Sequence, residues 1–300
     1  MPLIFLFVDG VGLGVSGRQN LFSRLFLPGL EGVLGGGLTA DLAPFADGDV
    51  AFSHIDACLG VEGLPQSATG QTAIFTGRNA AQVMGRHVSG FPLARLRQML
   101  EEDNLYRMLQ RRRLRCVFAN AFTEPYFTLR TTQRGWVSCS TRAALAAGLP
   151  LLREGDLLNG RAVYHDLTRE WLSRQGEGYT PITPEEAADH LLEMAAEADF
   201  VYHEFFLTDA AGHRQDEAML KELLKRYDRF FCALVRNKPR EVSLLLTSDH
   251  GNCEDLGSKG HTVNSVPLLV VGRGSREIAG QVTQLTQIAE AVTSTADIWS

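Results

Sequence analysis

Continuous apolar runs recur along the chain and predict its buried strands. A strand covered on both faces is typically an unbroken run of apolar residues rather than an alternating one. The strongest runs are Leu3–Val8, Phe200–Phe206, Val242–Leu246 and Val266–Val271. Residues 49–58 and 115–119 are weaker candidates for further strands.

Apolar residues at helical spacing predict helices between these runs. The segments are 67–76, 93–112 with a break near Asp103–Asn104, 141–147, 184–198, 215–236 and 284–296. The start at residue 184 is the clearest, because Thr183 can cap the helix, Pro184 suits its first turn and Glu186 completes a capping box.

Strands that alternate with helices predict an α/β fold, with a mostly parallel sheet and helices on both faces. Residues 86–180 are less regular and rich in arginine. We therefore expect a core domain formed by residues 1–85 plus 181–300, and a small inserted lid over 86–180 that recognises the substrate.

Composition and charge narrow the functional classes. The 300 residues are 45% hydrophobic with a net charge of −6, and no dense basic face is present, so nucleic acid is not an expected partner. No apolar segment reaches the roughly 18 residues needed to span a membrane, and the first apolar run stops at Asp9 without a basic leader. Five scattered cysteines without CxxC spacing predict reduced thiols and a cytoplasmic protein. The oligomeric state cannot be read from these patterns.

Polar residues that can bind metal follow or precede four of the predicted strands. They are Asp9, then Asp209 with His213, then Asp249 with His250, and finally His261. Each one alone is more often a turn residue or a surface residue. Ligands in α/β sheets collect beyond the carboxyl ends of the strands, so these groups are expected to converge. Three carboxylates and three imidazoles suit two divalent cations such as Zn²⁺ or Mn²⁺, and paired cations serve phosphoryl transfer.

A nucleophile is expected in the loop Gly63–Thr72, which is rich in small and hydroxyl residues and leads into a helix. Free N–H groups at such a helix start can receive phosphate. Ser67, bound to a metal, could lose its proton and attack phosphorus. The alternative is that Ser67 only caps the helix.

These motifs resemble the alkaline phosphatase superfamily, in particular the branch with cofactor-independent phosphoglycerate mutase and phosphopentomutase. The resemblance covers about the first 80 residues and residues 184–300. It rests on the blocks Val-Asp-Gly-Val-Gly, Ser-Ala-Thr-Gly-Gln, Asp-Ala-Ala-Gly-His-Arg-Gln-Asp, Thr-Ser-Asp-His-Gly-Asn and Gly-His-Thr-Val-Asn-Ser-Val-Pro. It implies that Ser67 becomes a transient phosphoserine. It further implies two metal sites, which comprise Asp9, Asp249, His250 and Ser67 in one and Asp209, His213 and His261 in the other.

Two departures from the mutase pattern favour hydrolysis. Gln71 stands where both mutase families have a histidine, and the interval 86–180 is much shorter than the second domain of these phosphoglycerate mutases. A mutase must hold its dephosphorylated intermediate away from water, which a short lid does less well. Arg86 and His87 could contact the substrate, although a structural role at the lid junction is the simpler interpretation.

The predicted function is therefore a metal-dependent phosphoryl-transfer enzyme that hydrolyses a small phosphomonoester through a phosphoserine. One alternative is an intramolecular phosphomutase acting on phosphoglycerate or a phosphopentose. The other is a non-catalytic, metal-stabilised binding protein with the same fold.

Overall fold

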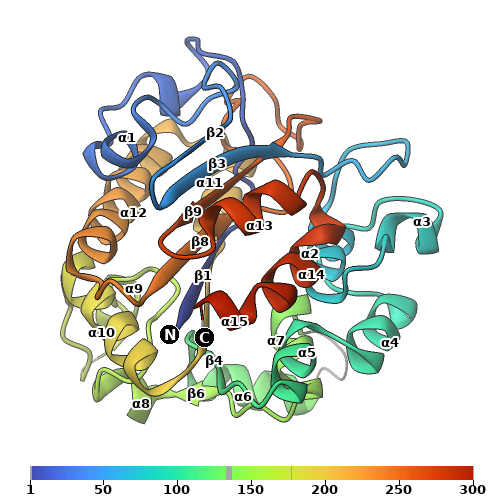
Figure 1. The fold of residues 1–300 in the computed structure, drawn as a ribbon. Helices are drawn as coiled ribbons and strands as arrows, with labels where there is room; N and C mark the ends of the chain where they lie inside the picture. The colour runs from blue at the N-terminus through green and yellow to red at the C-terminus, as the bar shows by residue number, and fades with distance from the viewer. Residues whose placement is uncertain (1, 133–136, 177, 300) are drawn as a thin grey trace.

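The computed structural model describes residues 2–132, 137–176 and 178–299 (Figure 1). Its centre is a seven-stranded sheet with the order β2-β3-β9-β8-β1-β7-β4. The strands are β1 (Leu3–Val8), β2 (Phe45–Asp47), β3 (Val50–Ile55), β4 (Cys116–Phe118), β7 (Phe200–Phe205), β8 (Ser243–Thr247) and β9 (Val266–Val271). A separate two-stranded sheet pairs β5 (Ala121–Phe122) with β6 (Leu152–Arg153).

The α/β prediction is confirmed, and the sheet is mixed. Strands β4, β7, β1 and β8 are parallel neighbours, whereas β9 runs antiparallel to β8, β3 to β9 and β2 to β3. Because β9 runs opposite to β8, the residues that precede β9 lie at the same edge as the residues that follow β8. This reversal brings His261 to the carboxyl edge of the parallel strands.

Helices cover both faces of the sheet, as the apolar runs predict. Successive side chains of a strand point to opposite faces, so Leu3, Phe5 and Phe7 of β1 enter one core while the residues between them enter the other. One core includes residues of α2, α4, α5, α7, α13, α14 and α15, and the other includes residues of α1, α10, α11 and α12. Figure 1 shows α1, α10 and α12 on one side of the sheet and α2 and α14 on the other.

The helix boundaries follow the sequence closely in several places. The helices are α1 (Pro28–Leu34), α2 (Ser67–Thr76), α3 (Ala80–Met84), α4 (Ala94–Glu102), α5 (Leu105–Arg111), α6 (Glu124–Thr132), α7 (Cys139–Ala146), α8 (Glu154–Leu158), α9 (Glu170–Ser173), α10 (Pro184–Glu197), α11 (Leu207–Arg214), α12 (Glu217–Asn237), α13 (Ser275–Gln281), α14 (Ile288–Ser294) and α15 (Ala296–Trp299), with short 3-10 turns at Leu21–Ser23 and Leu285–Gln287. The capping box at the start of α10 is present, with Thr183 accepting from the Glu186 N–H and Glu186 accepting from the Thr183 N–H.

Two helical segments differ from the sequence prediction. Residues 207–214, which are not among the predicted helices, form α11. The helix expected over 284–296 is divided into a 3-10 turn, α14 and α15. The division comes at Thr295, whose hydroxyl donates to the Ala291 carbonyl at 2.6 Å and also contacts the ring nitrogen of Trp299.

The region 86–180 is tied closely to the central sheet. Its strand β4 is the edge strand beside β7, and helices α4, α5 and α7 share a core with α2. Whether it works as a substrate-recognising lid stays a prediction. None of the helices in the described ranges has both the length and the apolar character needed to cross a membrane.

Candidate metal centre and adjoining cavity

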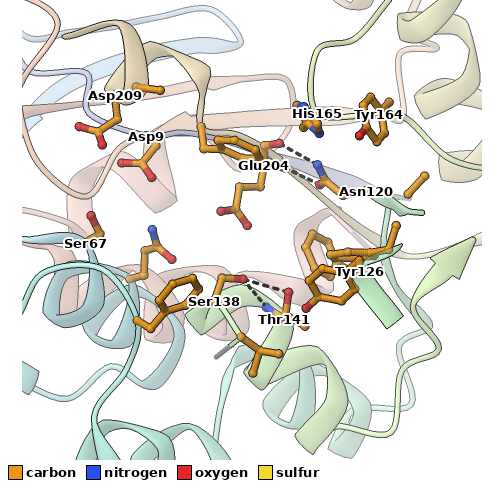
Figure 2. A pocket seen from close by; sticks show the side chains of 18 of the residues that line it. Asp9, Ser67, Asn120, Tyr126, Ser138, Thr141, Tyr164, His165, Glu204 and Asp209 are labelled. Atoms are coloured by element: carbon orange, nitrogen blue, oxygen red, sulfur yellow. Dashed lines mark hydrogen bonds between the residues drawn. The ribbon is translucent and has the colours of Figure 1, made fainter. Parts of the chain in front are cut away.

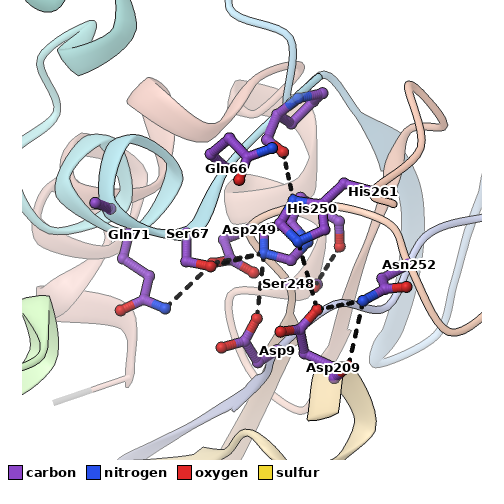
Figure 3. Close-up of polar contacts among 12 residues, drawn as sticks. Asp9, Gln66, Ser67, Gln71, Asp209, Ser248, Asp249, His250, Asn252 and His261 are labelled. Atoms are coloured by element: carbon purple, nitrogen blue, oxygen red, sulfur yellow. Dashed lines mark hydrogen bonds and ion pairs between the residues drawn. The ribbon is translucent and has the colours of Figure 1, made fainter. Parts of the chain in front are cut away.

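Six predicted metal ligands and Ser67 meet at one edge of the sheet. Figure 3 shows Ser67 with five of them, all except His213. Asp9 directly follows β1, and Asp249 and His250 lie just beyond β8. Asp209 and His213 lie on α11, one helical turn apart, so their side chains share one face. Ser67 is the first residue of α2.

The first group of side chains surrounds the Nε2 atom of His250. This nitrogen lies 3.0 Å from Ser67 Oγ, 3.3 Å from Asp9 Oδ1 and 3.6 Å from Asp249 Oδ2. Ligand atoms of Asp9, Asp249 and His250 all lie within 4.8 Å of one another. All three residues are buried.

The second group surrounds Asp209. Its carboxylate oxygens lie 3.4 Å from His213 Nε2 and 3.7 Å from His261 Nε2, and the two imidazole nitrogens are 3.1 Å apart. Ligand atoms of Asp209, His250 and His261 also lie within 4.8 Å of one another, so His250 stands between the two groups. The rings of His250 and His261 stack with centroids 3.7 Å apart. Unlike these two, His213 is substantially exposed.

Burial and mutual repulsion perturb the titration of this cluster. Burial, followed by the charges of Asp249 and Asp209, raises the pKa of Asp9 well above its usual range. Burial and the charge of Asp209 raise the pKa of Asp249 to about 7. Burial, followed by the neighbouring His261, lowers the pKa of His250 to about 3. Without a cation, the charged carboxylates are therefore poorly stabilised here.

The donor set fits divalent cations on further grounds. Within the described residues, the buried oxygens Asp9 Oδ1 and Asp249 Oδ1 have no hydrogen-bond partner. His261 Nδ1 lies 2.7 Å from the Pro65 carbonyl, to which it must donate, and this leaves Nε2 to face Asp209 and His213. A second hydrogen bond that fixes the ring in this way is the usual arrangement for a metal-binding histidine. Mixed carboxylate and imidazole ligands suit Zn²⁺ or Mn²⁺.

Neighbouring polar residues hold the ligands in place. Gln71 Nε2 donates to Asp249 Oδ2 at 3.2 Å, and Asn252 Nδ2 donates to Asp209 Oδ1 at 2.6 Å. Glu254 is buried and accepts from the N–H groups of Gly12 and Asn252, which ties together the loops after β1 and β8. Gln71, noted in the sequence as a departure from the mutases, thus touches a predicted ligand directly.

The start of α2 differs from the sequence expectation in one respect. The N–H groups of Ala68 and Thr69 both donate to the Val88 carbonyl, at 3.1 and 3.3 Å, so they are not available to a phosphate. Gly70 lets α2 approach the ligand loop, because a Cβ at this position would lie 2.8 Å from the Asp249 carbonyl oxygen. Ser67 is therefore positioned by helix packing.

A cavity of about 630 Å³ adjoins the cluster (Figure 2). Asp9, Ser67 and Asp209 line one end, and Asn120, Tyr164 and His165 belong to its wall further away. Arg86 and His87 are not among the described residues that line it. Arg86 is exposed, and His87 Nε2 lies 3.2 Å from the Val61 carbonyl. Their contact with substrate stays a prediction.

Sequence reasoning missed Glu204, a buried carboxyl group of β7 that lines this cavity. The Ser140 hydroxyl donates to it, and Asn120 bonds both the N–H and the carbonyl of its backbone. Burial raises the pKa of Glu204 to about 7. The available signal was a glutamate inside an apolar strand run.

Comparisons with known proteins agree with the motifs and the geometry. Residues 173–297 match the Metalloenzyme superfamily. A 2,3-bisphosphoglycerate-independent phosphoglycerate mutase of Thermococcus gammatolerans is 29% identical over 151 residues, which cover 40% of this chain and 36% of that protein. The match therefore spans only about a third of the relative's length.

Solved structures show the same fold. The protein PH0037 of Pyrococcus horikoshii aligns with a TM-score of 0.59 at 15% identity, covering 99% of this chain and 96% of the other. Alkaline phosphatase from the Antarctic bacterium TAB5 aligns with a TM-score of 0.55 at 13% identity, covering 100% and 98%. Motif order, the family match over residues 173–297 and the fold together support an alkaline phosphatase-superfamily metalloenzyme.

Proposed function

We propose that the protein hydrolyses a phosphomonoester, using Ser67 as the nucleophile beside two divalent cations. The observation that carries this proposal is the convergence of the Ser67 hydroxyl with the carboxylates and imidazoles at one sheet edge. Ser67 Oγ lies 3.0 Å from His250 Nε2, at the end of a cavity large enough for a small substrate.

The roles of the ligands follow from their grouping. Asp9, Asp249, His250 and Ser67 would hold one cation, and Asp209, His213 and His261 the other, in agreement with the distances within each group. Bound cations of this kind supply Lewis acidity, which polarises a phosphate and favours an ionised hydroxyl. Zn²⁺ and Mn²⁺ both suit these ligands.

The covalent steps proceed at Ser67. Its oxygen attacks phosphorus, so a bond from Oγ to phosphorus forms while the bond from phosphorus to the alcohol oxygen breaks, and the alcohol leaves with a proton. Water then attacks the phosphoserine, the bond from Oγ to phosphorus breaks, and inorganic phosphate leaves. Gln71 keeps Asp249 oriented throughout, because its amide donates to that carboxylate.

Serine phosphorylation is the most direct test. After incubation with 4-nitrophenyl phosphate and an acid quench, mass spectrometry should find about 80 Da added on the peptide that carries Ser67. Ser67→Ala should remove this mass and lower kcat by at least about a thousandfold, while Ser294→Ala, on an exposed helix end, should change neither. Full turnover in Ser67→Ala would remove the serine from the mechanism.

A phosphomutase is the second candidate, because the sequence relatives carry that name. The ligand motifs that this chain shares with those relatives support a mutase, whereas Gln71 and the short 86–180 region favour hydrolysis. Phosphorus NMR distinguishes the two: stoichiometric inorganic phosphate supports the hydrolase, and an isomerised phosphate ester without free phosphate supports the mutase. No turnover of any phosphomonoester, phosphodiester or sulfate ester would leave a metal-stabilised binding protein.

The remaining expectations belong to this proposal. We infer a small phosphorylated molecule as the substrate and no role for nucleic acid, in keeping with the net charge of −6. The five cysteines are free thiols, which supports the expected cytoplasmic location.

A further inference from the structure

The cavity beside Ser67 is the place where the alcohol portion of a substrate would lie. Its lining extends from Ser67, Asp9 and Asp209 across β4 and β5 to Tyr164 and His165 (Figure 2). A phosphate placed at the ligand cluster would therefore direct its ester group into this space. Pockets of this volume, about 630 Å³, commonly bind small molecules.

Apolar atoms make up most of the surface that lines the cavity. Aromatic side chains contribute to it, among them Phe91, Phe118, Phe122 and Tyr126. Several are held in fixed orientations by ring contacts, such as Phe118 against Phe122 at 5.7 Å and Phe122 against Tyr126 at 4.5 Å. A wall of this kind gains free energy by removing apolar surface from water.

Positive charge is absent from the described part of this wall, which includes no lysine or arginine. Three described arginines of neighbouring elements are engaged elsewhere. Arg142 pairs with Glu101, Arg153 pairs with Glu124, and the guanidinium of Arg169 donates to the Leu157 carbonyl. Burial lowers the pKa of His165 to about 4, so its ring is neutral near pH 7.

The polar groups in the wall are mostly uncharged. Asn120, Thr123, Ser138 and Thr141 offer hydroxyl or amide groups, and the acidic residues are Asp9 and Asp209 at the ligand cluster and Glu204 nearby. Against the described part of the wall, a carboxylate or a second phosphate on the substrate would lose its hydration without meeting a cationic side chain, which is costly. An uncharged ring would lose little.

We propose that the substrate is a phosphomonoester of an uncharged, apolar alcohol with a group about the size of an aromatic ring, and that this group binds between Phe91 and the Phe122 side of the cavity. This inference rests on the proposed hydrolysis at Ser67. It distinguishes the protein from an enzyme that acts on phosphoglycerate, whose carboxylate the described cavity wall does not match.

The test compares alkyl phosphates, so that the leaving alcohols have similar reactivity. With the metal-loaded full chain, 2-phenylethyl phosphate should show a kcat/KM at least about tenfold above glycerol 1-phosphate and 3-phosphoglycerate, as expected when an apolar group fills an apolar pocket. Phosphocholine is included because aromatic walls also bind quaternary ammonium groups. Equal or higher values for 3-phosphoglycerate, glycerol 1-phosphate or phosphocholine would overturn the proposal.

Variants locate the preference in the cavity. Phe91→Ala and Phe122→Ala should each lower kcat/KM for 2-phenylethyl phosphate about tenfold and leave glycerol 1-phosphate nearly unchanged. Phe26→Ala is the matched control, because Phe26 is 76% exposed and outside the cavity lining. Phe91 is 46% exposed, so that variant carries the test if Phe122→Ala fails to fold. Unchanged preference in a folded Phe91→Ala would contradict the proposal.

A binding measurement separates this inference from the proposed hydrolysis. The non-hydrolysable 2-phenylethylphosphonate should bind to the metal-loaded Ser67→Ala protein with a negative heat-capacity change in calorimetry, since apolar surface is buried. The Phe91→Ala change in the same background should weaken that binding about tenfold. If 4-nitrophenyl phosphate is not hydrolysed but the phosphonate binds in this way, only the proposed activity fails. If 4-nitrophenyl phosphate is hydrolysed and the phosphonate does not bind, only the present inference fails.

Discussion

Glu204 is the clearest case of a single side chain whose environment departs from its usual one. It lies in β7 among apolar neighbours, lines the cavity and accepts a hydrogen bond from Ser140. Burial raises its pKa to about 7. A carboxyl group with a raised pKa keeps its proton in the folded state at a pH where the unfolded chain has lost it, so the folded state is favoured less as pH rises.

We therefore predict that Glu204→Gln stabilises the metal-free protein at high pH. The unfolded carboxyl has a pKa near 4.5 and the folded one about 7, so the stability contributed by the protonated form is complete below about pH 4.5 and is lost as pH rises through 7. The free energy of unfolding of the variant, compared with that of the parent protein, should be more favourable at pH 8 than at pH 4 by on the order of 3 kcal/mol. Urea denaturation of chelator-treated protein measures this, with the exposed Glu197→Gln as control. An unaltered pH slope would contradict the prediction.

Residues of the candidate site could be predicted from the sequence where a polar residue directly follows an apolar run. Asp9, Asp249 and His250 were found because each follows an apolar run that ends abruptly. Glu204 was not found, because it lies inside such a run next to His203, and a one-dimensional pattern does not show which of two buried polar residues faces a cavity. The contact of Gln71 with Asp249 likewise depends on how a helix packs, which the sequence does not display.

The packing of α2 against the ligand loop is the main feature at the level of elements. Gly70 allows this approach, since a Cβ there would lie 2.8 Å from the Asp249 carbonyl oxygen and 3.0 Å from its Cβ. The helix carries Ser67 three residues earlier and Gln71 one residue later, so a shift of α2 would move both side chains relative to Asp249.

Gly70→Ala should therefore impair the site through the helix. Overpacking of this kind typically costs about 1–3 kcal/mol, and we expect kcat for 4-nitrophenyl phosphate to fall about tenfold or more as Ser67 moves. Gly32→Ala is a matched control in α1, where a Cβ meets no atom within 4 Å. That variant should be neutral or slightly stabilising, because alanine favours a helix. Thermal unfolding and turnover measure both changes, and normal activity in Gly70→Ala would show that the close approach has no functional part.

Element positions were predictable where the apolar pattern is long or sharply bounded. β1 and β9 agree residue for residue, and the break between α4 and α5 falls at Asp103–Asn104. Helix α11 was not predicted because its eight residues, Leu207–Arg214, include no apolar stripe. The direction of β9 could not be predicted either, since an apolar run looks the same in a parallel and an antiparallel strand.

At the scale of the whole molecule, the two groups of ligands predict two bound cations. Loss of a ligand from one group should therefore remove only one of them. Elemental analysis should find about two equivalents of Zn²⁺ or Mn²⁺ per chain, and Asp209→Asn should reduce this to about one. Asp47→Asn, on the exposed β2, should retain both. Cations at about a hundredfold excess over their Kd should also stabilise the fold by about 3 kcal/mol, so a chelator should lower Tm. One equivalent in the parent protein, or two in Asp209→Asn, would argue against the two-site assignment.

The pairing of β4 with β7 bears on how substrate preference can change within this architecture. β7 carries Glu204, and its outer edge is covered by a strand contributed by the 86–180 region. Replacing residues 86–180 with a segment that lacks such a strand would remove β4. It would leave unpaired backbone groups along the edge of the apolar strand β7, and such an edge is prone to aggregation. Any exchange of the 86–180 region, by recombination or by engineering, must therefore transplant a sheet strand along with the pocket wall.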